Sequence, residues 1–191
     1  KTKIACEIKN YNPNDHLDRK LANKLDLVSQ YALISSNEAL TTSKLLDSNI
    51  DRKRIGVIWA SGNGGATTYD NSIKEYYGNQ QERKLSPYFV PKVLVDTSSG
   101  IISIQHGLKG VNYTTVSACA SGSTAISDAF NYIRWGKADA MITGGSDAPI
   151  CPSLISGFNS LRALSTNNEN PTEASRPFDS NRDGFIMGEG A

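Results

Sequence analysis

The sequence lacks the features that would place it in several specialised classes of protein. It contains no apolar run of about 18 residues, the length that a helix needs to cross a bilayer. An excess of charge is also missing, because 20 basic residues are balanced by 19 acidic ones in a chain of 191 residues. Without a basic surplus, the composition favours neither nucleic acid nor an anionic membrane surface as a partner.

Cysteine and histidine are scarce as well. Cys6, Cys119 and Cys151 are an odd number of cysteines, and their spacings match no metal motif. The chain begins KTKIACEIKN, which shows no signal-peptide pattern. We therefore expect free cysteines in a reducing cytoplasm, with neither a metal nor another cofactor. Of the two histidines, His16 suits a solvated turn, whereas His106 could in principle serve a cysteine as a base.

The most informative stretch surrounds Cys119. Residues 111–118 alternate β-branched and small side chains, which predicts a strand that ends at Cys119. Apolar residues then recur at three- and four-residue spacing up to Gly136, which predicts a helix with one buried face. That face would comprise Ile126, Ala129, Phe130 and Ile133. Residues 138–143 predict a second, buried strand, so the unit is strand, cysteine, helix, strand.

Cys119 is the candidate nucleophile of this unit. Free N–H groups at the first turn of a helix stabilise an anion, and the thiolate is the reactive form of cysteine. Small neighbouring side chains would let a substrate carbonyl approach the sulfur, and the Cys119 N–H could stabilise an oxyanion. A buried structural cysteine is the alternative, because most free cysteines are of that kind. The strand-to-helix junction favours the nucleophile.

Several motifs in fixed order resemble one family. VSACASG is followed by ADAMITGGSDA, then by SGFNSLRALST and ASRPFDSNRDGFIMGEGA. Together they resemble the elongating β-ketoacyl-acyl carrier protein synthases of type II fatty acid synthesis and related polyketide pathways. The resemblance covers residues 1–191 and implies an α/β fold, the thiolase-like layered α-β-α arrangement with a mixed central sheet. The chain would be most of the first of two similar halves, an N-terminal ketosynthase domain truncated at both ends.

The resemblance also implies the chemistry of Cys119. The thiol would accept an acyl group as a thioester from acyl carrier protein. Malonyl carrier protein would then lose carbon dioxide and attack that thioester, which gives a 3-keto chain that is longer by two carbons. The family's catalytic histidines match neither His16 nor His106, so we expect that this chain alone can be acylated at most and cannot condense.

Two residues match the acyl pocket of the family. Phe158 matches an aromatic residue beside the cysteine, although an ordinary core phenylalanine would give the same pattern. Asn63 lies in a glycine-rich turn after a predicted central strand at residues 55–60, where the family commonly has an apolar residue. An unpaired amide beside an alkyl chain costs free energy. Asn63 therefore suggests a shorter, unsaturated or oxygenated acyl group.

Five basic residues match positions at which the family docks its acidic carrier protein. They are Lys20, Lys24, Arg83, Lys84 and Arg162. The first two lie one turn apart on an amphipathic helix that we predict over residues 17–40, although Asn23 replaces a basic residue that is frequent between them. A solvated helix face or an ordinary charged loop would explain the same residues.

Two other functions stay open. A non-catalytic partner subunit of the chain-length-factor kind would resemble these enzymes, but such subunits usually lack the cysteine. A thiolase-like or hydrolytic acyltransferase is the second; residues 144–148 nearly match the GxSxG motif, but no histidine follows them. In the synthase interpretation the substrates are malonyl and acyl carrier protein. The family also pairs subunits through the strand at residues 111–117, so we expect a homodimer.

Overall fold

The computed structural model describes residues 1–79 and 84–191. Its strands are β1 (Ile55–Ala60), β2 (Asn112–Thr115) and β3 (Ala140–Gly145). Its α-helices are α1 (Arg19–Ala22), α2 (Leu27–Ser43), α3 (Ala66–Gly78), α4 (Phe89–Val93), α5 (Thr97–His106), α6 (Ser121–Arg134) and α7 (Pro152–Ser160). Short 3-10 turns lie at Pro13–Asp15, Leu45–Asp47, Arg52–Arg54 and Pro171–Glu173.

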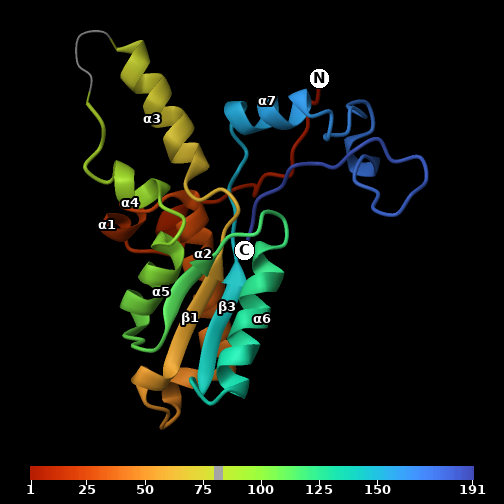
Figure 1. The fold of residues 1–191 in the computed structure, drawn as a ribbon. Helices are drawn as coiled ribbons and strands as arrows, with labels where there is room; N and C mark the ends of the chain where they lie inside the picture. Colours follow the sequence, from red (N-terminus) through yellow and green to blue (C-terminus); the bar gives the residue numbers. More distant parts are fainter. Residues whose placement is uncertain (80–83) are drawn as a thin grey trace.

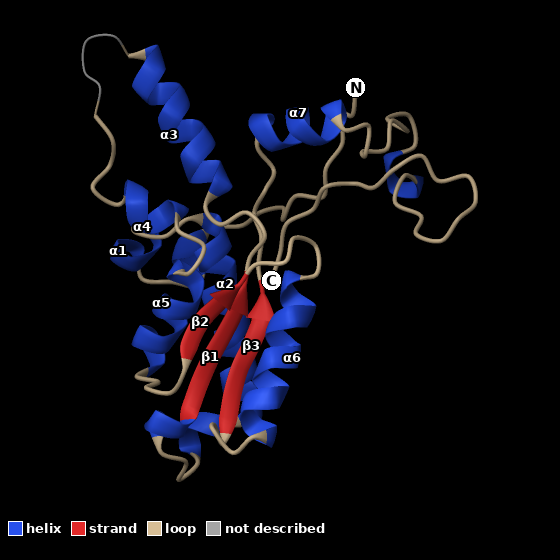
Figure 2. Ribbon diagram, viewed as in Figure 1, coloured by secondary structure: helices blue, strands red, loops and turns tan. Residues whose placement is uncertain are grey.

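The three strands form one parallel sheet in the order β2-β1-β3. Ile58 of the central strand is paired with Tyr113 on one side and Thr143 on the other. Every residue of β1 is buried, as its continuous apolar sequence predicts for a strand that is covered on both faces. Figures 1 and 2 show α5 and α2 over one face of this sheet and α6 over the other.

Side-chain alternation along β1 divides the core between these two layers. Ile55, Val57 and Trp59 pack in the cluster that includes residues of α2 and α5. Ile58 and Ala60 point the other way and pack with Ala125 and Ala129 of α6. The layered α-β-α arrangement is therefore confirmed. Its described sheet is parallel throughout, and the antiparallel component of the expected mixed sheet is limited to an isolated bridge between Asp147 and Gly190.

Helix α6 has the predicted position, but only Ala129 of its predicted buried face is buried. Ala125 and Ala129 face the sheet, whereas Ile126, Phe130 and Ile133 are exposed, Phe130 to 63%. Only the alanines are small enough to let the helix approach the strands closely at this point. The apolar spacing predicts a helix, but two adjacent stripes of α6 are apolar, and the spacing does not say which one meets the sheet.

The prediction of a single helix over residues 17–40 is also wrong, because the chain forms α1 and α2 with a break between them. The buried Asp26 carboxylate accepts the Val28 N–H at 3.0 Å and thereby caps the start of α2. Its other oxygen accepts the Thr68 N–H, at 3.0 Å, and the Thr68 hydroxyl, so it also fastens α3. The local cap by Asp26 thus marks the start of α2, and the contacts with Thr68 hold α3 against it.

Within residues 1–79 and 84–191, every helix is too short or too polar to cross a bilayer.

Shortening Ile58 to alanine tests the two-sided core. Ile58 is fully buried, so Ile58→Ala should lower the free energy of unfolding by about 2–5 kcal/mol through lost burial and the cavity left behind. Ile104→Ala is the matched control, because Ile104 is 77% exposed and its loss should cost less than about 0.5 kcal/mol. Urea denaturation measures both, and equal losses would contradict the described packing.

Candidate active site

The candidate site lies at the carboxyl edge of the sheet. Since the three strands are parallel, the loops that follow them meet at this edge. They enclose a cavity of about 350 Å³, called the Cys119 cavity below. Its lining comprises Ala60, Ser61, Ala118, Cys119, Ser121, Gly122, Gly145, Ser146, Asp147, Gly190 and Ala191.

Cys119 is exposed in the tight turn between β2 and α6. The residue before it, Ala118, has a positive φ of 51°, a left-handed conformation that is strained for alanine. Helix α6 begins at Ser121, so Cys119 stands two residues ahead of the first helical residue and not within the first turn.

Ser121 holds this strained turn closed. Its hydroxyl donates to the Ala118 carbonyl at 2.6 Å and accepts the Ser117 N–H at 2.8 Å. The Ser121 N–H reaches the same Ala118 carbonyl at 3.1 Å. The Thr115 hydroxyl, at the end of β2, donates to the Ser121 carbonyl at 3.1 Å. Ser121 thus links the end of the strand to the start of the helix and fixes the backbone on both sides of the thiol.

Asp147 organises the opposite side of the Cys119 cavity. One carboxylate oxygen accepts the Ser61 hydroxyl at 3.0 Å and the Asn63 N–H at 3.1 Å. The other oxygen accepts the Gly62 N–H at 3.0 Å. A side chain on Gly62 would point at this oxygen, 3.5 Å away, and at the Ala118 carbonyl oxygen, 3.6 Å away. The turn after β1 therefore packs between Asp147 and the cysteine turn.

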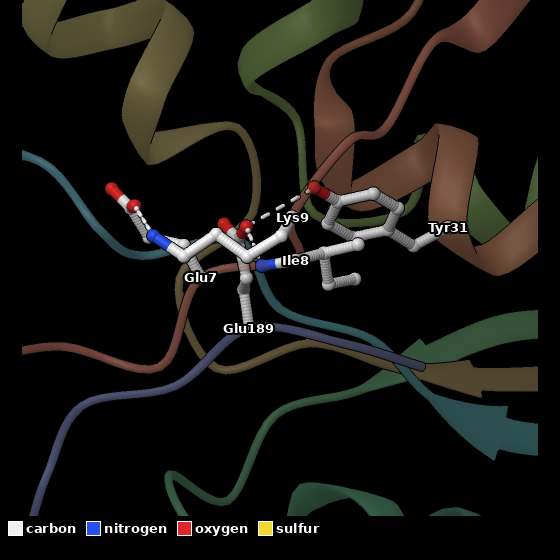
Figure 3. Close-up of polar contacts among 5 residues, drawn as sticks. All are labelled: Glu7, Ile8, Lys9, Tyr31 and Glu189. Atoms are coloured by element: carbon white, nitrogen blue, oxygen red, sulfur yellow. Dashed lines mark hydrogen bonds and ion pairs between the residues drawn. The ribbon is translucent and has the colours of Figure 1, made fainter.

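The segment that ends at Ala191 closes the cavity from a third side. Gly190 and Asp147 exchange two backbone hydrogen bonds, each of 3.0 Å. As Figure 3 shows, the Glu189 carboxylate accepts the Ile8 N–H at 2.9 Å and the Tyr31 hydroxyl at 3.3 Å. Burial and the Glu189 charge raise the pKa of Tyr31, so its hydroxyl stays protonated and available as a donor.

The two predicted pocket residues lie in different places. Asn63 is exposed beside the Cys119 cavity, and its amide nitrogen lies 3.5 Å from the Asp147 carboxylate. Phe158, on α7, packs edge-to-face on Phe185 with ring centroids 5.4 Å apart. It is not among the described residues that line the cavity. Neither Asn63 nor Phe158 is therefore part of the lining, although Asn63 contacts Asp147, which is.

The predicted docking residues are exposed wherever the structure describes them. These residues are Lys20, Lys24, Lys84 and Arg162, while Arg83 lies outside the described residues. Lys20 belongs to α1, and the Lys24 ammonium lies 5.8 Å from the centre of the Tyr88 ring, next to α4. Arg162 follows α7.

His106 does not serve Cys119. It ends α5, which returns the chain to the amino end of β2, and Cys119 follows the other end of that strand. Burial and the nearby charge of Arg52 lower the pKa of His106. Among the described residues, no group of three or more His, Cys, Asp or Glu side chains could hold a metal ion.

Sequence reasoning missed Ser121, Asp147 and Glu189 as site residues. Asp147 could have been found, because it directly follows a predicted buried strand and polar groups of a site gather where parallel strands end. The Glu189 contacts join segments that lie far apart in the sequence, and nothing local indicates them.

Comparisons with known proteins agree on one family. The sequence profile described as "Beta-ketoacyl synthase, N-terminal domain" matches residues 3–191. The 3-oxoacyl-[acyl-carrier-protein] synthase 2 of Staphylococcus aureus (strain N315) is 45% identical over 188 residues, which are 98% of this chain and 45% of that protein. The synthase 2 of Synechocystis sp. is 40% identical, over 99% of this chain and 45% of its own length. This chain thus spans less than half the length of these relatives.

Solved structures give the same result. A β-ketoacyl synthase from Burkholderia phymatum STM815 superposes with a TM-score of 0.82 and 30% identity, over 98% of this chain and 46% of that one. A type II polyketide acyl carrier protein in complex with its ketosynthase, AntDE:AntF, gives a TM-score of 0.77 and 28% identity. The match covers 85% of this chain and 41% of that one.

Removing the Ser121 hydroxyl tests the geometry of the cysteine turn. Ser121→Ala leaves the part-buried Ala118 carbonyl and Ser117 N–H with fewer partners, so stability should fall by about 0.5–1.5 kcal/mol and alkylation of Cys119 should slow. Ser123→Ala is the control, because Ser123 is exposed in the same helical turn. Thermal unfolding and the rate of iodoacetamide labelling measure both effects. Equal behaviour of the two variants would show that Ser121 does not hold the turn.

Proposed function

Because the chain belongs to the β-ketoacyl synthase family, through that family's N-terminal domain, we propose that it is the acyl-accepting part of a 3-oxoacyl-[acyl-carrier-protein] synthase. The observation that carries this proposal is the position of Cys119. Its thiol is exposed beside a cavity at the carboxyl edge of a parallel sheet, directly ahead of a helix start. The enzyme class is acyltransferase, and the expected truncation at both ends stays a prediction.

The first step of the reaction follows from this geometry. The Cys119 thiolate attacks the thioester carbonyl of an acyl carrier protein. A new sulfur–carbon bond forms, the bond to the carrier sulfur breaks, and the carrier leaves as a thiol. N–H groups at the start of α6 and the Cys119 N–H favour the negative charges of this step. The fixed turn presents the sulfur at one position, which reduces the entropic part of the barrier.

The second step needs groups that this chain does not supply. Malonyl carrier protein loses carbon dioxide, and the resulting carbanion attacks the acyl-enzyme carbonyl and expels the Cys119 thiolate. Charge that develops on the malonyl carbonyl has to be stabilised. His106 lies at the far end of the sheet, and His16 precedes α1, so neither is placed for that role. We therefore propose that residues 1–191 can be acylated but cannot condense alone.

The quaternary arrangement and partners are further parts of the proposal. Within the described chain, β2 lies at one edge of the sheet and pairs only with β1. A homodimer through residues 111–117 would extend the sheet across this edge. Acyl carrier protein would dock on the exposed basic residues, and the cytoplasm would be the place of action. Phe158 and Asn63 are proposed to contact the acyl chain. The presence of Cys119 disfavours a chain-length-factor role.

Acylation of the full-length gene product tests the proposed nucleophile. Incubation with an acyl carrier protein loaded with a fatty acyl group should add the mass of one acyl group, because Cys119 forms a stable thioester. Cys119→Ser should abolish this mass gain, whereas Cys6→Ser should retain it, because Cys6 is exposed as well but lies outside the Cys119 cavity. Intact-protein mass spectrometry gives the result. Loading that persists in Cys119→Ser would refute the assignment.

Charge reversal on α1 and beside it tests carrier docking. Lys20→Glu combined with Lys24→Glu should raise the KM for acyl carrier protein about tenfold, because acidic surfaces then face each other. The kcat should stay close to the wild-type value, and so should the rate with acyl-pantetheine. Lys53→Glu is the control, since Lys53 is exposed before the amino end of β1. An equal increase of KM in both proteins would place the docking surface elsewhere.

A further inference from the structure

A single charged side chain lines the cavity of the candidate thiol in the described structure. Of the residues that line the Cys119 cavity, only Asp147 carries a charged side chain. The two ion pairs within the described residues join Lys9 with Glu7 and Arg54 with Asp139, so neither of them neutralises Asp147. A carboxylate therefore lies in the same cavity as the sulfur, without a cationic partner in that part of the chain.

The hydrogen bonds of Asp147 keep this charge in place. The Ser61 hydroxyl and the N–H groups of Gly62 and Asn63 donate to it over 3.0–3.1 Å. The Asn63 amide nitrogen is a fourth and longer contact at 3.5 Å. The same contacts fix the turn after β1. The position of this turn and the negative charge in the cavity therefore both depend on the Asp147 side chain.

We propose that Asp147 determines which acyl groups reach Cys119, because it holds the turn of residues 61–63 in place and repels acyl groups that bear a negative charge. The proposal rests on the proposed function and adds a selection step to it. The two carrier-bound substrates differ in this property, since a fatty acyl group is neutral and a malonyl group carries a carboxylate. Repulsion by Asp147 would disfavour bonding of the malonyl group to the free thiol, whereas condensation needs the malonyl group only beside the acyl thioester.

The size of the effect follows from electrostatics. Two like charges in a partly solvated cavity repel each other enough to change a rate severalfold, and salt weakens the effect. Loading of a neutral group should be limited by geometry alone. The effect of charge can therefore be separated from the effect of geometry with two variants of Asp147. One variant keeps the charge of the side chain, and the other keeps its shape.

The experiment compares probes that differ in charge. Iodoacetamide and iodoacetate alkylate the same thiol and have nearly the same size, and their rates with free cysteine correct for intrinsic reactivity. Butanoyl-pantetheine and succinyl-pantetheine form a second pair, which tests acyl transfer itself. The proteins are the full-length gene product and its Asp147→Asn and Asp147→Glu variants. Asp26→Asn is the matched control, because Asp26 also accepts two N–H groups and a hydroxyl but does not line the cavity.

We expect the corrected preference for the neutral probe to be about fivefold in the wild-type protein and to disappear in Asp147→Asn. Asp147→Glu should keep the preference while both of its rates fall, because its longer side chain displaces the turn. Asp26→Asn should keep the wild-type preference even if its melting temperature falls. Thermal unfolding identifies any variant that does not fold. If Asp147→Asn is one of them, the salt dependence of the wild-type preference decides the question, because a preference caused by repulsion must weaken as salt is added.

Two results would overturn different claims. If the wild-type protein shows no preference, or Asp147→Asn keeps it, then Asp147 does not select by charge, although the cysteine can still be the nucleophile. If butanoyl-pantetheine does not load the wild-type protein at all, the proposed function itself fails. The neutral probe thus tests the nucleophile, and the ratio of the two probes tests Asp147.

Discussion

The parallel pairing of β1 with both β2 and β3 is the constraint on which the candidate site depends. Because all three strands run in the same direction, the turn after β1, the cysteine turn after β2 and Asp147 after β3 meet at one edge. The opposite edge receives the polar Arg52–Arg54 turn and the end of α5 with His106. The direction of the strands therefore decides which of the chemically interesting residues can act together.

Hydrogen bonds between distant segments then convert this edge into a defined cavity. Ser121 closes the strained turn around Ala118, Asp147 fixes the turn after β1, and Glu189 ties the last residues to Ile8 and Tyr31. Each contact satisfies backbone groups that an irregular loop would otherwise leave unpaired. The loops are thus held by the scaffold, which a site that positions a nucleophile requires.

Sequence patterns predicted the parts of the fold that depend on local properties. Strand β1 has the predicted bounds, because six consecutive buried apolar residues need no tertiary information, and Cys119 lies at the predicted junction. The predicted buried face of α6 was wrong except at Ala129. Ile126 and Ala125 belong to adjacent apolar stripes, and only packing against the sheet decides which stripe is buried. The break before α2 follows the cap of Asp26 on the Val28 N–H, a local signal that the apolar spacing alone does not contain. The pocket roles of Phe158 and Asn63 came from resemblance alone and stay predictions; neither residue lines the cavity of the described chain.

A crystal structure of the full-length protein after acylation would test the central claim most directly. The account predicts density for an acyl group on the sulfur of Cys119, with its carbonyl oxygen near the Cys119 N–H and its chain passing the turn of residues 61–63. That turn should keep its hydrogen bonds to Asp147. An acyl group attached to another residue, or a chain that leaves the cavity without touching this turn, would contradict it.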